Sequence, residues 1–175
     1  MTELMISEIL KFLLPSIILF FIVRMALRAY LGNEALKREE MRRSGNRQIT
    51  LPLRLQAYER LTLLLERISP VQAVTRVLQT GMSALQFQIL LTQNIRDEFE
   101  HNMVQQIYVS PESWGLIRSA REEVIRLINT VAAECDSSAS ANDLARMIIE
   151  RSSEWDKNPV QTAISKLKQE AAELF

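Results

Sequence analysis

The side chains of this sequence that could do chemistry gather in one stretch, EFEHNMVQQIY, at residues 98–108. Glu98 and His101 stand in a Glu-x-x-His spacing, the half-site of di-iron bundles, in which two helices each supply one such motif. The chain has a single histidine, so the second motif is missing. Glycine-rich phosphate loops, Cys/His metal spacings and Gly-x-Ser-x-Gly elbows are also absent from the sequence. We therefore predict no catalytic residue, metal ligand or cofactor. One alternative stays open, a metal-binding helical-bundle enzyme that uses Glu59, Glu66, Glu98 and His101.

The same stretch contains a polar strip, which consists of Glu98, His101, Asn102, Gln105 and Tyr108. On a helix the first four residues share one face, and most of that helix is expected to be buried. One interpretation is structural: the polar groups satisfy one another and cap nearby helix ends, because buried polar groups need partners. The other is functional, a surface that binds a protein partner or a second copy of the chain. Residues 58–60 could supply counterparts, such as an Arg60–Glu98 ion pair.

Helical periodicity after Thr50 predicts that an all-α bundle of about five to six helices positions this strip. No stretch there alternates with period two for long enough to be a strand. The longest helix is expected over residues 83–108, where apolar residues recur every four positions. Because each such step overshoots a full turn by about 40°, the row winds around the helix and must contact several neighbours. The row consists of Phe87, Leu91, Ile95, Phe99, Met103 and Ile107.

Capping residues and prolines predict where the other helices begin and end. A helix over residues 51–68 precedes a short one over residues 71–79. The boundaries of the remaining helices are expected at Thr80-Gly81, at Ser110-Pro111-Glu112, at the polar residues 136–140 with Asn142-Asp143 as a cap, and at Asn158-Pro159.

The stretch from Ile9 to Leu27, ILKFLLPSIILFFIVRMAL, predicts a transmembrane helix. Its length is close to the roughly 20 residues that cross the hydrocarbon core of a bilayer. Lys11 and Arg24 lie near its ends, where long side chains can reach the headgroups. A cleaved signal peptide is a disfavoured interpretation, because such a peptide begins with basic residues and ends at small ones, and this stretch does neither. A buried core helix would need a polar face, which residues 12–23 lack.

Charge predicts the orientation of this helix. Residues 24–47 hold seven basic and three acidic residues, whereas residues 1–23 hold a single lysine. By the positive-inside rule the C-terminal side is cytoplasmic and the N-terminus lies outside. We expect a single-pass protein of the bacterial inner membrane with four segments: a short extracytoplasmic tail (1–8), the transmembrane helix (9–27), a basic juxtamembrane helix or linker (28–47) and a cytoplasmic α-helical domain (48–175). The basic neck, expected to rest on anionic headgroups of the lipid bilayer, consists of Arg24, Arg28, Lys37, Arg38, Arg42, Arg43 and Arg47.

The charge of residues 48–175 bears on possible partners. This segment has 13 basic and 16 acidic residues, so it lacks the broad positive field of a nucleic-acid-binding domain. We expect no nucleic acid as a partner, with binding through the basic neck as a second alternative. The single Cys135 cannot form an intramolecular disulfide, which agrees with a reducing cytoplasm.

Four motifs are distributed along the chain behind the N-terminal run: ITLPLRLQAYERLTLLLERISP, EFEHNMVQQIYVS, AREEVIRLIN and LKQEAAELF. Together they resemble an uncharacterised family of small single-span, membrane-anchored proteins of Bacteroidota-type bacteria. The resemblance implies an inner-membrane location and an all-helical cytoplasmic part. It implies no functional residues, because the family has no assigned activity.

These features predict a membrane-anchored cytoplasmic scaffold or adaptor that acts by protein–protein interaction and is not an enzyme. Tethering would raise the effective concentration of a membrane-bound partner or of another copy of the chain. The expected partner is an unidentified protein, or a second copy in a homo-oligomer.

Overall fold

The computed structural model describes residues 19–25, 27–28, 48–136 and 138–174. The chain divides into two units, residues 1–50 and residues 51–175. In the first unit, residues 19–25 and 27–28 are helical and exposed. The second unit begins with a helix over residues 51–68, called helix 51–68 below. It continues with α2 (Pro70–Val77), α3 (Ala84–Asn102), the 3₁₀-helix η1 (Met103–Tyr108), α4 (Pro111–Glu134), α5 (Ala141–Ser153) and α6 (Pro159–Ala172).

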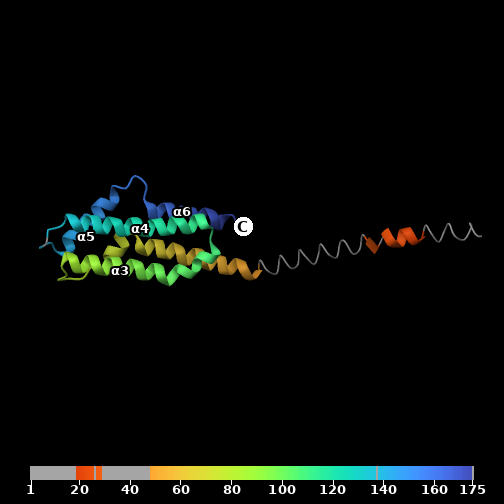
Figure 1. Cartoon of the computed structure of the whole chain (residues 1–175), viewed down its shortest axis with the longest axis horizontal. Helices are drawn as coiled ribbons and strands as arrows, with labels where there is room; N and C mark the ends of the chain where they lie inside the picture. Colours follow the sequence, from red (N-terminus) through yellow and green to blue (C-terminus); the bar gives the residue numbers. More distant parts are fainter. Residues whose placement is uncertain (1–18, 26, 29–47, 137, 175) are drawn as a thin grey trace, which may run out of the picture. The chain divides into compact units, whose positions relative to one another are not determined.

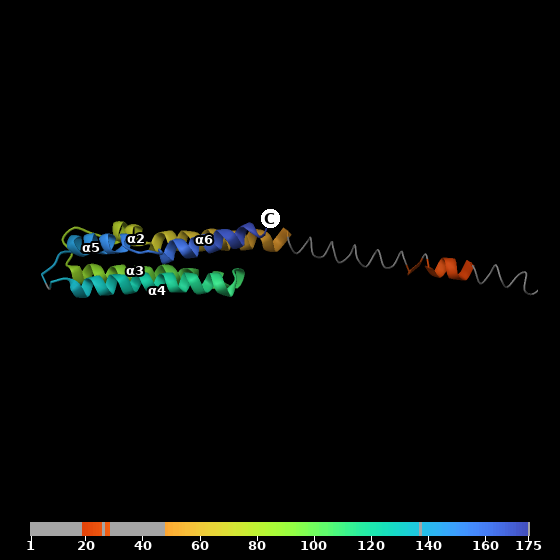
Figure 2. The ribbon, with the colours of Figure 1, turned by 90° about the horizontal axis from the view of Figure 1, so that it is seen from above.

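The helices of the second unit form a bundle. In Figures 1 and 2, α3 and α4 lie side by side with α5 at one end, and α6 runs along α4 and helix 51–68. The ranges that the structure describes contain no strand, so the predicted all-α class is confirmed for this unit. One apolar core connects the α-helices of this unit, and its fully buried members include Leu61, Leu65, Phe87, Leu91, Ile117, Val124, Leu144, Ile148 and Leu167.

Side-chain caps fix the starts of the helices. The Ser110 hydroxyl accepts a hydrogen bond from the Ser113 amide, and Asn158 Oδ1 accepts from two amides of α6, as the sequence predicts. Ser83 and Ser140 each form a reciprocal capping box, with Gln86 and Asp143. The predicted cap at Asn142-Asp143 is therefore placed too late, because Ser140 is the N-cap and Asp143 its partner.

Backbone hydrogen bonds also join the start of α3 to the start of α5. The Ala84 amide donates to the Ala139 carbonyl, and the Ala141 amide donates to the Met82 carbonyl, both at 3.1 Å. Gly81, in the turn before α3, has a φ of +86°, a conformation that a side chain would strain. This turn and the paired caps fix where the long helix α3 begins.

The predicted helix over residues 83–108 is wrong in its last six residues. Phe87, Leu91, Ile95 and Phe99 are buried as predicted, but Met103 and Ile107 are exposed. The reason is the change to a 3₁₀-helix at Met103. A 3₁₀-helix turns about 120° per residue rather than about 100°, so a four-residue spacing no longer returns to the same face. The change leaves apolar side chains of η1 on the surface.

The described ranges include no helix long and apolar enough to cross a membrane. The finding contradicts the predicted transmembrane helix at residues 9–27, and with it the single-pass location in the inner membrane. Residues 9–18 and 26 of that prediction lie outside the described residues. Of the basic neck, Arg24 and Arg28 are described and exposed, while Lys37, Arg38, Arg42, Arg43 and Arg47 lie outside the described residues.

Candidate functional site

The polar strip is divided between two environments. Glu98, His101 and Asn102 line a groove of about 670 Å³ between helix 51–68 and α3, called the partner groove below. Gln105 and Tyr108 belong to η1 and do not line this groove, because the chain leaves the α-helical path at Met103. The other lining residues are Arg60, Leu63, Leu64, Arg67, Asn94 and Asp97.

The Glu98 carboxylate of the partner groove accepts hydrogen bonds from two arginine side chains. Its side chain is 17% exposed. Arg67 Nη1 donates to both of its oxygens, at 3.1 and 3.2 Å, and Arg76 Nη1 donates to Oε1 at 3.3 Å. Arg76 Nη2 also donates to Asn94 Oδ1. Arg60 lines the same groove, but the ion-pair partners of Glu98 are Arg67 and Arg76 rather than the predicted Arg60. The ion pairs of this carboxylate therefore join helix 51–68, α2 and α3.

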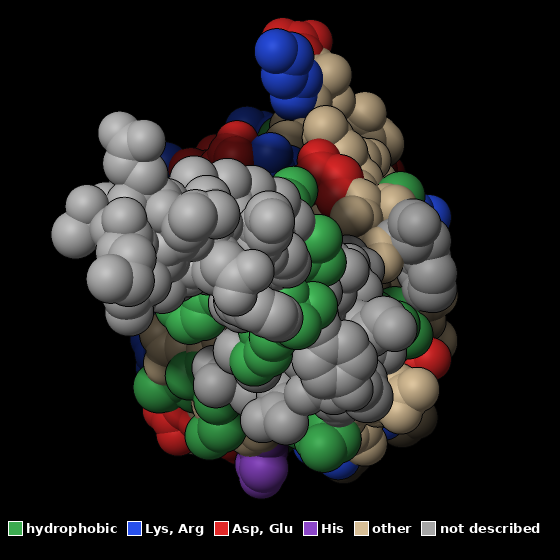
Figure 3. Space-filling view, turned by 90° about the vertical axis from the view of Figure 1, so that its right-hand side faces the viewer, with side chains coloured by type: hydrophobic (Ala, Val, Ile, Leu, Met, Phe, Trp, Pro, Cys, Tyr) green, Lys and Arg blue, Asp and Glu red, His purple; other side chains and the backbone are tan. Residues whose placement is uncertain are grey.

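His101 is the chain's single histidine and is exposed at the surface (Figure 3). Its Nδ1 lies 2.6 Å from the Asp97 carbonyl oxygen. Because a carbonyl can only accept, Nδ1 carries the proton, and in that tautomer Nε2 is the acceptor. Asn102 Nδ2 donates to the Glu98 carbonyl at 2.8 Å, so its amide closes the end of α3. The His101 ring can therefore accept a hydrogen bond from a molecule in the groove.

The residues of the metal alternative do not converge. Both oxygens of Glu98 accept from guanidinium groups, and guanidinium groups would repel a cation. Glu59 and Glu66 line a separate apolar hollow on helix 51–68 that includes neither Glu98 nor His101. Within the part of the chain that the structure describes, no group of three or more His, Cys, Asp or Glu side chains could hold a metal ion. This geometry gives the metal alternative no support.

Sequence reasoning missed a second polar cluster, centred on Glu170 of α6. The Glu170 side chain is 11% exposed. Its carboxylate accepts from the Ser110 amide and hydroxyl, both at 2.8 Å, from the Ser113 hydroxyl, and from the Tyr58 hydroxyl at 2.9 Å. Arg54 donates to the Tyr58 hydroxyl at 3.0 Å and lies 3.7 Å from Glu170. The cluster joins helix 51–68, the start of α4 and α6, so its arrangement is that of a structural junction.

The titration of this cluster follows from its contacts. Burial alone would raise the pKa of the Glu170 carboxyl, but the hydrogen bonds from Ser113, Ser110 and Tyr58 outweigh it, so the pKa lies below its ordinary value of 4.5. Burial, and then the hydrogen bond to Glu170, raise the pKa of the Tyr58 phenol above 10.0. The carboxylate is therefore ionised and the phenol protonated at neutral pH.

A dependence of stability on pH follows. Because the folded-state pKa of Glu170 is depressed, its contribution to folding is complete above pH 4.5 and is lost as the pH falls through the folded-state value. We expect the free energy of unfolding of the wild type to exceed that of Glu170→Gln at neutral pH, and the difference to shrink in acid. Urea unfolding between about pH 7 and pH 3, followed by tryptophan fluorescence, measures it. A difference that stays constant over this range would contradict the assignment.

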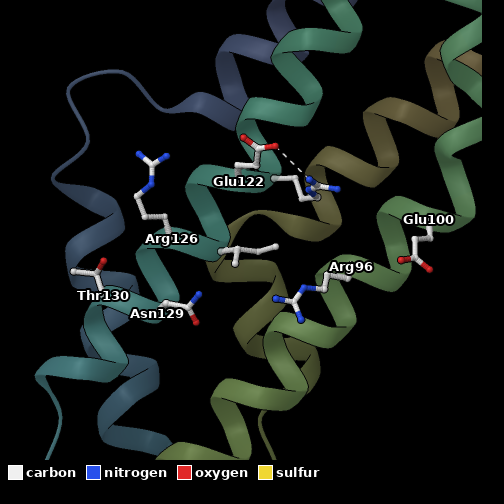
Figure 4. Close-up of a pocket in the computed structure, with 8 residues that line it drawn as sticks. Arg96, Glu100, Glu122, Arg126, Asn129 and Thr130 are labelled. Carbon is white, nitrogen blue, oxygen red and sulfur yellow. Dashed lines mark hydrogen bonds and ion pairs between the residues drawn. The ribbon is translucent and has the colours of Figure 1, made fainter.

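A second groove, of about 660 Å³, lies between α3 and α4 (Figure 4). The Arg121 guanidinium stacks on the Phe99 ring, 4.2 Å from its centroid, and Nη2 lies 3.3 Å from Glu122 Oε1. Arg121 Nε is buried and has no hydrogen-bond partner among the described residues. In Figure 4 the Arg96 side chain extends toward α4. Glu100, one turn later on α3, also lines the groove. The other residues that line this groove are Ile125, Arg126, Asn129 and Thr130.

Comparisons with known proteins give a family but no activity. A search of curated proteins and a search of solved structures found no match. A family model described as a family of unknown function, DUF7935, matches residues 4–174. The match agrees with the predicted resemblance to an uncharacterised family, but neither a bacterial group nor a membrane anchor follows from it. Because the model covers nearly the whole sequence, the chain belongs to the DUF7935 family of unknown function.

Proposed function

We propose that the chain is a non-enzymatic scaffold or adaptor, and that a protein partner binds in the partner groove. The observation that carries this proposal is the fixed charge cluster at Glu98, where arginines of helix 51–68 and α2 hold one carboxylate of α3. Charges held in one geometry at the wall of a groove set the register and specificity of a protein interface. A groove that contains them can select a partner without any chemical step.

Apolar and hydrogen-bonding groups stand beside this cluster. Leu63 lines the groove and is half exposed, so its side chain is available as an apolar anchor. His101 offers Nε2 as an acceptor on the opposite wall. Protein interfaces typically combine a few apolar anchors and arginines at the centre with a polar rim. The lining of this groove has both components.

Substitutions in the groove test the proposal. We expect Leu63→Asp and Glu98→Ala each to weaken partner binding about tenfold or more, since each removes a central contact. His101→Ala should weaken it less, and Gln105→Ala and Tyr108→Ala least, because their side chains do not line the groove. A photo-crosslinking amino acid at position 101 of the full chain, followed by mass spectrometry, identifies the partner. Its affinity for each purified variant is then measured.

Thr162→Asp is the matched control, because Thr162 is exposed on α6 and does not line the partner groove. It should leave partner binding and the crosslinked product unchanged. Leu63 is exposed, so Leu63→Asp should unfold at nearly the wild-type urea concentration. If all the groove variants kept every native complex intact, the groove would not be the binding site and the proposal would fail.

A further inference from the structure

One surface of α3 and η1 is unusually apolar. Ten large apolar side chains are exposed among the described residues 51–174, and six of them belong to these two helices. Val104 and Ile107 are 67% and 70% exposed. Single exposed apolar residues are ordinary, but a continuous set points to an interaction surface. We call this surface the α3 outer face and define it by Leu85, Ile89, Leu90, Arg96, Glu100, Val104 and Ile107.

Helix geometry shows that these residues lie on one stripe about 140° wide, which also carries Gln93 and Asp97. At about 100° per residue, Ile89, Arg96 and Glu100 lie within about 60° of Leu85 around α3. At about 120° per residue in η1, Val104 and Ile107 eclipse each other and line up with Leu90 along one edge of the stripe. Glu98 points to the other side of α3, toward the partner groove. The α3 outer face is therefore a separate surface, and the inference drawn from it does not depend on the proposed function.

The middle of the stripe carries two opposite charges without a counterpart. Arg96 and Glu100 are exposed and form no ion pair or hydrogen bond among the described residues. They stand one turn apart on α3, and both line the groove between α3 and α4 (Figure 4). Charge and apolar groups are thus arranged symmetrically along the stripe, with the charges at its centre and apolar groups at both ends.

We propose that the α3 outer face binds the same face of a second copy of the chain, with the two α3 helices antiparallel. In such an isologous contact each residue meets a different residue of the other copy, and the contact is repeated by symmetry. With the two-fold axis at the level of residue 98, Arg96 meets Glu100 of the second copy. Leu90 then meets Val104 and Ile107 of the second copy. Both charge pairs and both apolar contacts are satisfied at once.

Charge reversal tests the central contact. Arg96→Glu places an acidic side chain opposite Glu100 of the other copy, in both of the symmetry-related contacts. Glu100→Arg likewise places a basic side chain opposite Arg96 in both contacts. We expect each variant alone to dimerise about tenfold or more weakly than the wild type. A mixture of the two variants should form a heterodimer, because every contact then joins opposite charges. Analytical ultracentrifugation of the full chain measures these states.

Cysteine crosslinking tests the geometry. In a Cys135→Ser background, Leu90→Cys and Ile107→Cys chains are mixed and oxidised, and a disulfide between the two is expected. Thr162→Cys on α6 is the matched control and should not be crosslinked to Leu90→Cys. A monomeric wild type, single variants that dimerise like the wild type, or equal crosslinking of the control would each overturn the proposal.

Discussion

Replacing Glu170 with alanine is expected to lower the free energy of unfolding by about 3 kcal/mol, a large part of the stability of a unit of this size. The substitution removes the acceptor of four hydrogen bonds from three donor residues and leaves the Ser113 hydroxyl, which is fully buried, without its partner. It also removes a negative charge from the N-terminus of α4, where the helix dipole favours one. Urea unfolding at neutral pH measures the loss. Both tryptophans, Trp114 and Trp155, belong to the second unit and report its unfolding.

Two variants separate the hydrogen bonds from the charge. Glu170→Gln keeps an acceptor oxygen but no charge, so it should lose about half as much stability as Glu170→Ala. Ser113→Ala removes one donor. In the double variant with Glu170→Ala, the loss of unfolding free energy should be smaller than the sum of the two single losses, since the two side chains share a contact. The control is Glu173→Ala, because Glu173 is exposed at the end of α6. If Glu170→Ala lowered the free energy of unfolding no more than Glu173→Ala does, the junction would not stabilise the fold.

Local signals in the sequence account for most of the fold. Each correct boundary depends on residues within one turn: Ser110 caps α4 and Asn158 caps α6. The apolar row from Phe87 to Phe99 is buried because its spacing suits an α-helix. Such features require no knowledge of the rest of the chain, and for that reason they can be predicted.

The candidate site is only partly predictable, because its partners are distant in sequence. The sequence pointed to Glu98 and His101 but suggested Arg60 as the partner, whereas Arg67 and Arg76 occupy that role. These arginines look alike in sequence, and only the packing of the helices decides which one reaches the carboxylate. Glu170 gave no signal at all, since it lies 57 and 112 residues from Ser113 and Tyr58.

The change from α3 to η1 was unpredictable for a related reason. Met103 and Ile107 continue the apolar spacing, so local periodicity favours the α-helix. In the structure the Tyr108 carbonyl instead accepts from Arg54 Nε at 3.2 Å, and Val109 is buried. These tertiary contacts lie beyond the reach of periodicity. They also expose the apolar residues on which the proposed self-association depends.

Phe99→Ala should have an effect as large as Glu170→Ala, a loss of about 3–5 kcal/mol, because it empties a site between α3 and α4. The Phe99 side chain is 4% exposed and its ring centroid lies 5.2 Å from that of Trp114. The ring also supports the Arg121 guanidinium, 4.2 Å from its centroid. Without the ring, Arg121 would lose its only stacking partner among the described residues while its Nε stays buried and unpaired. Urea unfolding measures the loss, and Trp114 fluorescence should shift as its neighbour disappears.

Phe99→Leu separates packing from the ring interactions. Leucine refills most of the volume but has no π-face, so the remaining loss should be about 1–2 kcal/mol, the size expected for one aromatic pair and one cation–π contact. Adding Arg121→Met to Phe99→Leu should then cost little, because the stacked cation is already unsupported, whereas Arg121→Met alone should cost more. If Arg121→Met had the same effect in both backgrounds, the stacked pair would not couple α3 to α4. Apolar contacts of the core would then hold the two helices together without it.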